Sequence, residues 1–304
     1  MDETEFIWLN GKLVKWHDAK IHVLTHTLHY GSGVFEGIRC YNTDKGPAIF
    51  RLKDHISRLM QSAKIIRIKS KFSQQDFEEA CKKIVRENKL KECYIRPIIY
   101  FGYGKMGLAT NDCVVDNSVA AWPWGSYLGE EGVKNGIRAK ISSYARKHAR
   151  PELAKSKTTG NYYNSTLAKM EALDAGFEEA IMLDSDGNVC ECSGENLFTV
   201  KNNVLITPPA TDALEGITRR SIIEIARNEG IKVEEKLFKP QELFNADEAF
   251  LTGTAAEVTP IREVDGHKIG AGKPGPVTKN LQAKYFGIIH GKDSKYEKWL
   301  DLVR

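Results

Sequence analysis

The stretch Lys157-Thr158-Thr159-Gly160-Asn161-Tyr162 is the most informative part of this chain, together with the later stretch Cys190-Glu191-Cys192-Ser193-Gly194-Glu195-Asn196-Leu197-Phe198. A lysine beside Thr-Thr-Gly is, taken alone, typical of a solvated loop. The same lysine, read with an acidic residue on a later strand, indicates an amine that forms an imine with a carbonyl group while a carboxylate assists. Lys157 and Glu191 are therefore the first candidate functional residues.

Six short motifs, two of them within these stretches, occur in one order along the chain. They are His29-Tyr30-Gly31-Ser32-Gly33-Val34-Phe35-Glu36-Gly37-Ile38-Arg39, Tyr94-Ile95-Arg96-Pro97, Lys157 to Tyr162, Gly194-Glu195-Asn196-Leu197-Phe198, Gly216-Ile217-Thr218-Arg219 and Gly253-Thr254-Ala255-Ala256-Glu257. Together they closely resemble the branched-chain amino acid aminotransferases, which belong to the fold-type IV enzymes that use pyridoxal 5'-phosphate (PLP). The likeness runs from about Phe6 to Gly275-Pro276-Val277-Thr278, so it covers nearly the whole chain.

The resemblance implies an α+β protein of the D-amino acid aminotransferase type. We expect a small N-terminal α/β domain at residues 1–121, a connector at 122–135, and a larger PLP-binding domain at 136–304 with mixed sheets, a pseudo-barrel and surrounding helices. The chain's own pattern agrees, because strands mixed with segregated helices favour α+β over a repeating βαβ sheet. Trp122-Pro123-Trp124-Gly125 is typical of a connector, since proline lacks an N–H donor and glycine relaxes the backbone.

Size and composition limit the classes of protein. The 304 residues exceed the usual domain size of ~100–200 residues, so one large or two medium domains are expected. The net charge of +4 comes without a basic block, which argues against a nucleic-acid partner. The N-terminus Asp2-Glu3-Thr4-Glu5 is unlike a secretory signal, and no long apolar run indicates a membrane span, so we expect a cytoplasmic protein with no membrane partner.

The six cysteines are too sparse for a disulfide scaffold and form no C-x-x-C pairs that would bind zinc, so we expect reduced thiols and no metal. Cys190 and Cys192 flank Glu191 and, on a strand, would point away from its carboxylate, as core packing requires. His26 and His29 lack a third ligand, so packing or hydrogen bonding is expected for them.

Local patterns predict the elements. Asn10-Gly11 between apolar runs indicates a hairpin over residues 6–16. Ile56, Leu59, Met60 and Ala63 repeat at helical spacing beneath Arg58. Ser73-Gln74-Gln75-Asp76 resembles a capping box that opens a helix to about residue 88. The other expected elements are strands at 48–51, 94–100, 118–124, 138–144, 179–183, 189–191, 197–200 and 204–206, and helices at 161–176, 218–228 and 277–286.

By resemblance, Lys157 is the Schiff-base lysine, which also moves a proton between carbon atoms once substrate displaces it. Lys155 does not fit the K-x-x-G-N-Y register. Glu191 would face the pyridine nitrogen and keep the ring protonated, so that the ring can absorb electrons from the substrate. Glu195 also matches the family pattern, with a supporting hydrogen-bond role.

The phosphate of PLP needs donors and positive charge. Gly216, Ile217 and Thr218 precede and open an amphipathic helix, whose N-terminus presents N–H groups and a favourable dipole to an anion. Arg58 and Thr254 match further phosphate contacts of the family. Position 215 is Glu where the family usually has Pro, and we expect its side chain to turn outward.

One pocket must accept both an aliphatic side chain and the distal carboxylate of glutamate. By resemblance, Phe35, Tyr162 and Trp124 line the apolar part, and a neighbouring subunit contributes Tyr30 and Leu108. The resemblance gives the remaining substrate contacts to Tyr94, Thr254 and Ala255 for the α-carboxylate, to Arg96 and Tyr127 for the distal carboxylate, and to Gly37 and Arg39 without a defined role. Arginine suits this task because its planar fork matches a carboxylate.

The resemblance thus implies a transaminase that moves the amino group of L-leucine, L-isoleucine or L-valine to 2-oxoglutarate, and a homo-oligomer, either dimer or hexamer. A D-amino acid aminotransferase or an aminodeoxychorismate lyase shares the expected fold. From another class, Gly102-Tyr103-Gly104-Lys105-Met106-Gly107 fits the outline of a dinucleotide-binding oxidoreductase, but the residues that follow are turn-like where that motif needs a helix. A non-catalytic relative is disfavoured because every chemical position is filled.

Overall fold

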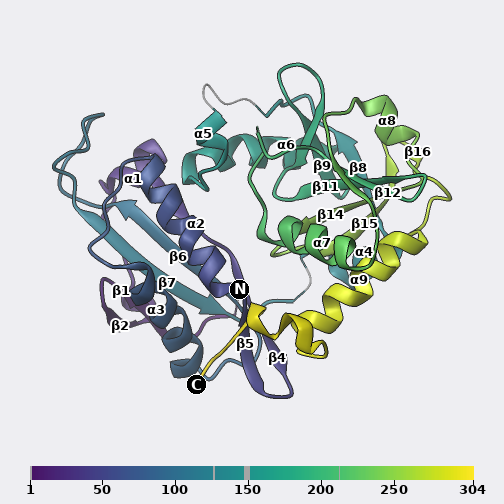
Figure 1. Ribbon diagram of the computed structural model, residues 1–304. Coiled ribbons are helices and arrows are strands. Elements are labelled where there is room, and N and C mark those ends of the chain that lie inside the picture. The colour runs from purple at the N-terminus through teal and green to yellow at the C-terminus, as the bar shows by residue number, and fades with distance from the viewer. Residues whose placement is uncertain (1, 126, 147–150, 212) are drawn as a thin grey trace. The chain divides into compact units, whose positions relative to one another are not determined.

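The computed structural model describes residues 2–125, 127–146, 151–211 and 213–304. The chain divides into two compact units. The first holds the described chain up to Trp124, together with Ser156–Tyr162 and Ile288–Arg304, and the second holds Gly125–Lys155 and Tyr163–Gly287. Each unit has its own β-sheet and its own buried core (Figure 1). The fold is α+β, as the sequence predicts.

The sheet of the first unit has eight strands, and its pairings are antiparallel. The strand order is β17 (Leu300–Leu302), β5 (Gly46–Phe50), β4 (Ile38–Thr43), β6 (Cys93–Phe101), β7 (Val115–Trp122), β1 (Phe6–Leu9) and β2 (Lys12–Lys15), and β3 (Gly33–Phe35) pairs with β6. The predicted hairpin is confirmed: Asn10 and Gly11 adopt φ values of 50° and 95°, the left-handed backbone that an Asn-Gly turn favours.

One face of this sheet packs against the helices α2 (Leu52–Ile65) and α3 (Gln74–Glu87) (Figure 1). Ile56 and Leu59 of α2 are fully buried in that core, and so is Phe77 of α3. The capping box is also confirmed, because the Ser73 Oγ accepts from the Asp76 N–H at 3.2 Å and the Asp76 carboxylate accepts from the Ser73 N–H at 2.8 Å. The opposite face carries the alternate residues of the same strands.

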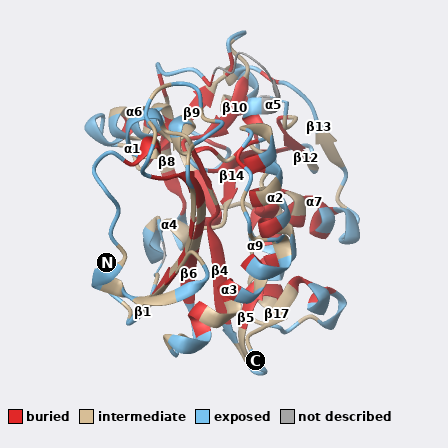
Figure 2. Ribbon diagram, turned by 90° about the vertical axis from the view of Figure 1, so that its left-hand side faces the viewer, coloured by how far each residue is buried: buried red, intermediate tan, exposed pale blue. Residues whose placement is uncertain are grey.

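The second unit has a nine-stranded sheet with both parallel and antiparallel pairs. Its order is β10 (Val189–Cys192), β9 (Glu179–Leu183), β8 (Ile137–Ile141), β15 (Glu257–Val264), β14 (Glu248–Gly253), β11 (Asn196–Lys201), β12 (Val204–Thr207) and β13 (Val233–Glu235), and β16 (His267–Lys268) pairs with β15. Buried residues run along the strands, whereas helices are buried on one side and exposed on the other (Figure 2).

The remaining helices range from single turns to the three longer helices α6, α7 and α9. They are η1 (Trp16–Asp18), α1 (His26–Tyr30), α4 (Gly129–Asn135), α5 (Pro151–Ala154), η2 (Thr159–Asn161), α6 (Tyr162–Asp174), α7 (Ile217–Asn228), α8 (Pro240–Phe244), α9 (Pro276–Ile289) and η3 (Ser294–Trp299). Among the described residues, no helix combines the length and the apolar character that crossing a bilayer requires.

The domain division differs from the expected one in two places. The boundary at Trp124 lies inside the predicted connector 122–135, which also contains the helix α4. Two segments of the expected large domain 136–304 belong instead to the first unit. The reason is backbone pairing between distant residues, since Thr158 forms a bridge with Val34 and Leu302 pairs with Ala48.

Two strand predictions were too long at their ends. The strand expected at 118–124 ends at Trp122, because Pro123 has no N–H to continue the ladder. The strand expected at 138–144 ends at Ile141. Local patterns also failed to predict the strands at 248–253 and 257–264, which form the centre of the second sheet.

Candidate functional site

The loop that carries Lys157 is held on both sides within the first unit. Its backbone N–H donates to the Ser62 Oγ of α2 at 3.0 Å, and its carbonyl accepts from the Phe35 N–H of β3 at 3.1 Å. Thr158 forms a bridge with Val34, so the loop runs beside β3 as an additional short strand. The backbone position of Lys157 is therefore fixed by a helix and a strand.

A close approach of two glycines completes this attachment. The Thr159 hydroxyl donates to the Gly31 carbonyl at 2.7 Å, and the Gly160 N–H donates to the same carbonyl at 3.1 Å. A Cβ at Gly31 would lie 2.7 Å from the Gly160 Cα, and Gly31 has a φ of +61°. Glycine at position 31 is thus required both by space and by backbone conformation.

The Lys157 amine lies in an aromatic setting. It donates a short hydrogen bond to the Tyr162 hydroxyl and lies 5.0 Å and 4.8 Å from the ring centres of Phe35 and Tyr162. The rings of Phe35 and Tyr162 meet edge to face at 4.8 Å. Lys155, which does not fit the K-x-x-G-N-Y register, is exposed. The structure therefore brings Lys157, Tyr162 and Phe35 together.

Arg58 of α2 faces a buried carboxylate. Its Nε and Nη2 donate to Glu36 at 2.6 Å and 2.8 Å, and the His55 Nδ1 lies 2.8 Å from the same carboxylate. Glu36 is fully buried, yet the charge of Arg58 and the bonds from both partners outweigh desolvation and hold its pKa far below the ordinary value. Burial in turn lowers the pKa of His55, against the opposing effect of Glu36.

The face of the first sheet away from α2 and α3 is aromatic and basic. Tyr94 lies opposite Arg39 on β4 and opposite Trp122 on β7, so these side chains share a face. The Tyr94 ring contacts Trp122 and Trp124 at 5.4 Å and 5.2 Å. The Arg96 guanidinium lies 4.8 Å from the Phe35 ring centre and 5.3 Å from the Tyr94 ring centre.

This aromatic face contains polar hydrogens that lack acceptors. Within the part of the chain that the structure describes, the Arg96 Nε and the indole nitrogens of Trp122 and Trp124 are buried without a hydrogen-bond partner. A buried donor without an acceptor is costly, by ~1–3 kcal/mol for each group. Such donors are expected where a ligand with acceptor oxygens binds.

Gly37 and Arg39 now have defined structural positions. A Cβ at Gly37 would lie 1.8 Å from the Tyr94 hydroxyl oxygen, so glycine is needed to admit the tyrosine. Arg39 is buried, its Nη2 donates to Glu92 at 3.1 Å, and its guanidinium lies 5.1 Å from the Tyr41 ring centre. Arg39 is therefore anchored by its own strand neighbours.

In the second unit, Glu191 of β10 is buried between two partners. Its Oε1 lies 2.5 Å from the Arg146 Nε, and its Oε2 accepts from the Leu214 N–H at 3.1 Å. Arg146 is itself buried and donates to the Ser165 hydroxyl at 3.0 Å. Glu191 is thus a fixed, ion-paired carboxylate and not an exposed strand residue.

The N-terminus of α7 matches its predicted geometry. Gly216 is the N-cap, with no side-chain cap on the first turn, and Ile217 and Thr218 are buried. A Cβ at Gly216 would lie 2.0 Å from the Asn196 Oδ1, so glycine is required here by space. Glu215 is exposed, which confirms the outward direction expected for it.

Glu195 belongs to a second buried acidic group. Glu179 is fully buried and pairs with the Lys169 amine at 2.7 Å, while the Ser193 hydroxyl donates to Glu179 at 2.5 Å. Burial, reinforced by the nearby charge of Glu179, raises the pKa of Glu195 to about 8. The protonated form of Glu195 is therefore favoured by its surroundings, which its sequence motif does not reveal.

The remaining predicted residues lie in turns and loops, except Tyr30, which is the last residue of α1. Thr254 and Ala255 lie in the turn between β14 and β15, and Tyr127 of the second unit has the Lys169 amine 5.3 Å from its ring centre. In the first unit, Leu108 is 88% exposed, whereas Tyr30 is 44% exposed and its ring contacts the His26 ring at 4.5 Å.

Two other kinds of site were considered in the sequence, a dinucleotide-binding loop at residues 102–107 and a metal site at His26 and His29. In the described stretch after Gly102–Gly107 no helix follows, as a dinucleotide motif would require, and His26 is bonded to Ser32 and to the Gly107 carbonyl, which is the hydrogen bonding expected for it. The described residues contain no group of His, Cys, Asp and Glu that would hold a metal ion.

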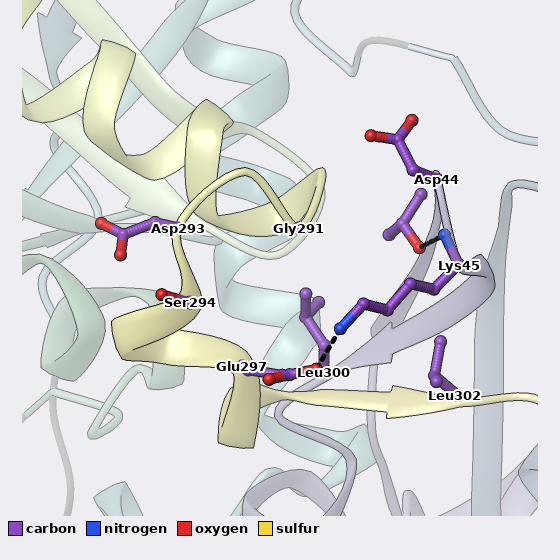
Figure 3. A pocket seen from close by; sticks show the side chains of 9 residues that line it. Asp44, Lys45, Gly291, Asp293, Ser294, Glu297, Leu300 and Leu302 are labelled. Carbon is purple, nitrogen blue, oxygen red and sulfur yellow. Dashed lines mark hydrogen bonds and ion pairs between the residues drawn. The ribbon is translucent and has the colours of Figure 1, made fainter.

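Cavities elsewhere do not coincide with the predicted residues. A cavity of about 170 Å³ lies between the β4–β5 turn and the chain end, where Lys45 reaches toward Glu297 (Figure 3). Another of about 250 Å³ is lined by Lys201, Phe238 and their neighbours. Neither is lined by a predicted site residue.

Sequence reasoning missed the residues that support this site. Glu36 lies inside a quoted motif but received no role, and a lone acid in an otherwise apolar and glycine-rich strand was the available signal. Arg146, His55 and Ser62 gave no local signal, because their partners lie far away in the sequence.

Comparison with known proteins identifies the family of this chain. A model of the family described as amino-transferase class IV matches residues 33–264. The branched-chain-amino-acid aminotransferase of Pseudomonas aeruginosa is 49% identical over 100% of this chain and 99% of the relative. The crystal structure of the Escherichia coli branched-chain amino acid aminotransferase has a TM-score of 0.97 and 46% identity, and covers 99% of this chain and 100% of that one. The branched-chain amino acid aminotransferase of Thermobaculum terrenum, solved in its PLP-form (holo-form), has a TM-score of 0.92 and 35% identity over 100% of both chains.

Proposed function

The chain belongs to the class IV aminotransferases and, within them, to the branched-chain amino acid aminotransferases, and we propose that it moves the amino group of L-leucine, L-isoleucine or L-valine to 2-oxoglutarate with PLP as cofactor. The products are the branched-chain 2-oxo acid and L-glutamate. The transfer is reversible, and the enzyme reacts first with the amino donor and then with the amino acceptor. It is a transaminase reaction, as the family requires.

The residues of the chain fit PLP by their chemistry. When bound, PLP supplies an electron sink that stabilises negative charge on the substrate Cα. Lys157 offers the amine for its aldehyde, Arg58 offers a cation for its phosphate, and Glu191 offers a carboxylate for its pyridine nitrogen. The PLP-form of the similar Thermobaculum terrenum protein supports the same cofactor here.

In the proposal, Lys157 would hold the cofactor through its amine, and the same amine would move the proton at the substrate Cα. The Tyr162 hydroxyl bonded to its Nζ orients the amine. The Lys157 N–H donates to the Ser62 Oγ and the Lys157 carbonyl accepts from the Phe35 N–H, so the backbone of the lysine would stay fixed whether or not its amine holds the cofactor.

Glu191 keeps the pyridine nitrogen protonated in the proposal. The Arg146 guanidinium, 2.5 Å away, stabilises the carboxylate as an anion and limits its orientations. The Leu214 N–H fixes the other oxygen at 3.1 Å. Thr254 and the N-terminus of α7 at Gly216, Ile217 and Thr218 are the proposed phosphate ligands beside Arg58.

The observation that carries the substrate assignment is the buried, unpartnered Arg96 Nε on the aromatic face. The Phe35, Tyr94 and Trp124 rings around it accept an aliphatic side chain, and the arginine receives the distal carboxylate of glutamate or 2-oxoglutarate. A single surface therefore accommodates both substrate classes. Tyr127 is proposed to assist Arg96, and Tyr94, Thr254 and Ala255 to hold the α-carboxylate.

Gly37 admits Tyr94 to this surface, and Arg39 lies directly opposite Tyr94 on the neighbouring strand. We assign both residues to the support of the α-carboxylate contact. Tyr30 and Leu108 are proposed to act in the site of a neighbouring subunit of a homo-oligomer, in keeping with their exposure. The size of the oligomer and the cytoplasmic location stay predictions.

The test is the visible absorbance of the PLP-loaded protein before and after adding L-leucine, with D-alanine added to a second portion. Loss of the band of the lysine-bound cofactor with L-leucine alone is the expected result. A response to D-alanine alone would instead assign the protein to the D-amino acid aminotransferases. The absence of any band in PLP-supplemented protein would refute the proposed cofactor.

A further inference from the structure

Glu36 has no place in the function proposed above, yet it is the most constrained carboxylate of the first unit. It is fully buried at the end of β3 and accepts from the Arg58 Nε at 2.6 Å and from the Arg58 Nη2 at 2.8 Å, while the His55 Nδ1 lies 2.8 Å away. Its own N–H donates to the Pro97 carbonyl at 2.9 Å. Both its backbone and its side chain are therefore fixed.

The bonds from Arg58 form a two-point fork. An arginine side chain has several rotatable bonds, and a single contact leaves its guanidinium free to turn, whereas two parallel N–H···O bonds fix the plane of the group. A guanidinium carries five N–H donors, more than one carboxylate uses. Glu36 can thus set the direction of Arg58 while an anion binds the same guanidinium.

The same strand and helix hold Arg58 and Lys157 at a defined spacing. On β3, the Phe35 N–H binds the Lys157 carbonyl and the next residue, Glu36, binds Arg58. On α2, Arg58 and Ser62 are four residues apart and so lie on one side of the helix, and Ser62 accepts from the Lys157 N–H at 3.0 Å. Two independent connections therefore relate the amine-bearing loop to the arginine.

We propose that Glu36, supported by His55, is a positioning residue that holds the Arg58 guanidinium in the orientation that binds the phosphate of the cofactor attached to Lys157. This inference rests on the proposed function, because it takes PLP as the cofactor. Glu36 does not touch the cofactor itself and acts through Arg58.

Two effects of Glu36 on a phosphate oppose each other, and their balance is measurable. Its negative charge partly cancels the attraction of Arg58 for the dianion, so its neutralisation would tighten binding if charge alone mattered. The two hydrogen bonds that the Glu36 carboxylate accepts fix the orientation of the Arg58 guanidinium, so loss of the carboxylate would weaken phosphate binding if this orientation matters more than the charge. We expect geometry to decide, since the carboxylate is wholly buried behind two short bonds from Arg58 and its charge is already neutralised there.

The test compares the affinities of the apoprotein for PLP and for pyridoxal, which has the same aldehyde but no phosphate. Both are followed by the visible absorbance of the lysine-bound aldehyde, so activity is not needed. In Glu36→Gln we expect the dissociation constant for PLP to rise by ~10–100-fold, the usual range for loss of a residue that orients a ligand-binding group. Pyridoxal affinity should stay unchanged.

Asp54→Asn is the matched control, because Asp54 also pairs with an arginine of this helix region, Arg51, at 2.5 Å. It should change neither affinity. In an Arg58→Met background, Glu36→Gln should have no further effect on the ratio of the two affinities. If Glu36→Gln does not fold, Glu36→Asp keeps the charge but shortens the reach, and it should still weaken PLP selectively.

The possible results separate the two hypotheses. PLP affinity that is unchanged or higher in Glu36→Gln, or PLP and pyridoxal affinities that fall equally, would overturn the positioning role. Wild-type apoprotein that binds neither compound would refute the proposed cofactor and, with it, this inference. Tight wild-type binding with an unaltered ratio in the variants overturns the role of Glu36 alone.

Discussion

The substitution Gly37→Ala tests the proposed substrate-binding face at the close contact between Gly37 and Tyr94. The added Cβ would lie 1.8 Å from the Tyr94 hydroxyl oxygen and 2.7 Å from its Cζ, both inside the 3.0 Å below which real Cβ contacts essentially do not occur. Tyr94 is only 7% exposed, and its ring is packed against Trp122 and Trp124, so it has little room to rotate away. The hydroxyl must therefore move by about an ångström or the strand must shift.

The expected size follows from these contacts. Overpacking of this kind destabilises a protein by ~1–3 kcal/mol, and a displacement of about 1 Å in a binding group lowers catalytic efficiency by roughly 100-fold. Because Tyr94 is proposed to bind the α-carboxylate, we expect kcat/KM for L-leucine to fall to that degree, with a clear rise in KM. The assay is steady-state kinetics with 2-oxoglutarate, accompanied by thermal unfolding.

The control for this variant is Gly287→Ala. Gly287 lies in α9 and no atom lies within 4 Å of a Cβ built there, so kcat/KM should be unchanged and the helix slightly more stable. A folded Gly37→Ala protein with wild-type KM for L-leucine would show that the Tyr94 hydroxyl does not bind the substrate carboxylate.

Three further predictions concern the cofactor residues and the buried acids. Lys157→Ala should abolish turnover while some PLP stays bound through the phosphate ligands, and substantial residual transamination would refute the role of the lysine. Arg146→Gln removes the cation 2.5 Å from Glu191, so single-turnover kinetics should show slower loss of the substrate Cα proton with PLP still bound, and an unchanged rate would separate the ion pair from catalysis. Because the pKa of Glu195 is raised from 4.5 to about 8 in the folded protein, this group removes stability as pH rises through that interval, by at most ~1.4 kcal/mol per pH unit. Glu195→Gln removes this penalty, so its Tm relative to the wild type should increase between about pH 4.5 and 8, and a pH-independent difference would contradict the raised pKa.

Local sequence signals predicted the elements that depend on neighbours in the chain. The Asn10-Gly11 turn and the capping box at Ser73 and Asp76 are interactions within a few residues, and both are present as expected. The strands at 248–253 and 257–264 were not recognised, because polar residues and Pro260 interrupt their apolar residues, so neither strand shows the alternating pattern that identifies one.

The candidate residues also divide into those that the sequence indicates and those that only the tertiary structure reveals. The register of the motifs by itself selected Lys157 over Lys155 and singled out Glu191 and Gly216, whereas Arg58 was indicated only by the family resemblance. Only the tertiary structure revealed the residues that hold them in place. Ser62 and Phe35 fix the lysine loop. Arg146 pairs with Glu191, and Glu36 accepts hydrogen bonds from Arg58.

The sequence determined the family of this protein and pointed to the groups proposed to act in it, because an amine for a covalent bond, a carboxylate and a turn for a phosphate each require particular residue types in a particular order. The tertiary structure decided their surroundings. Glu36 and Arg58, and likewise Arg146 and Glu191, are distant in the chain and meet only when the units fold, where burial removes water and makes each charge depend on its partner. Long-range pairing also moved residues 156–162 and 288–304 into the first unit, which no local pattern could indicate.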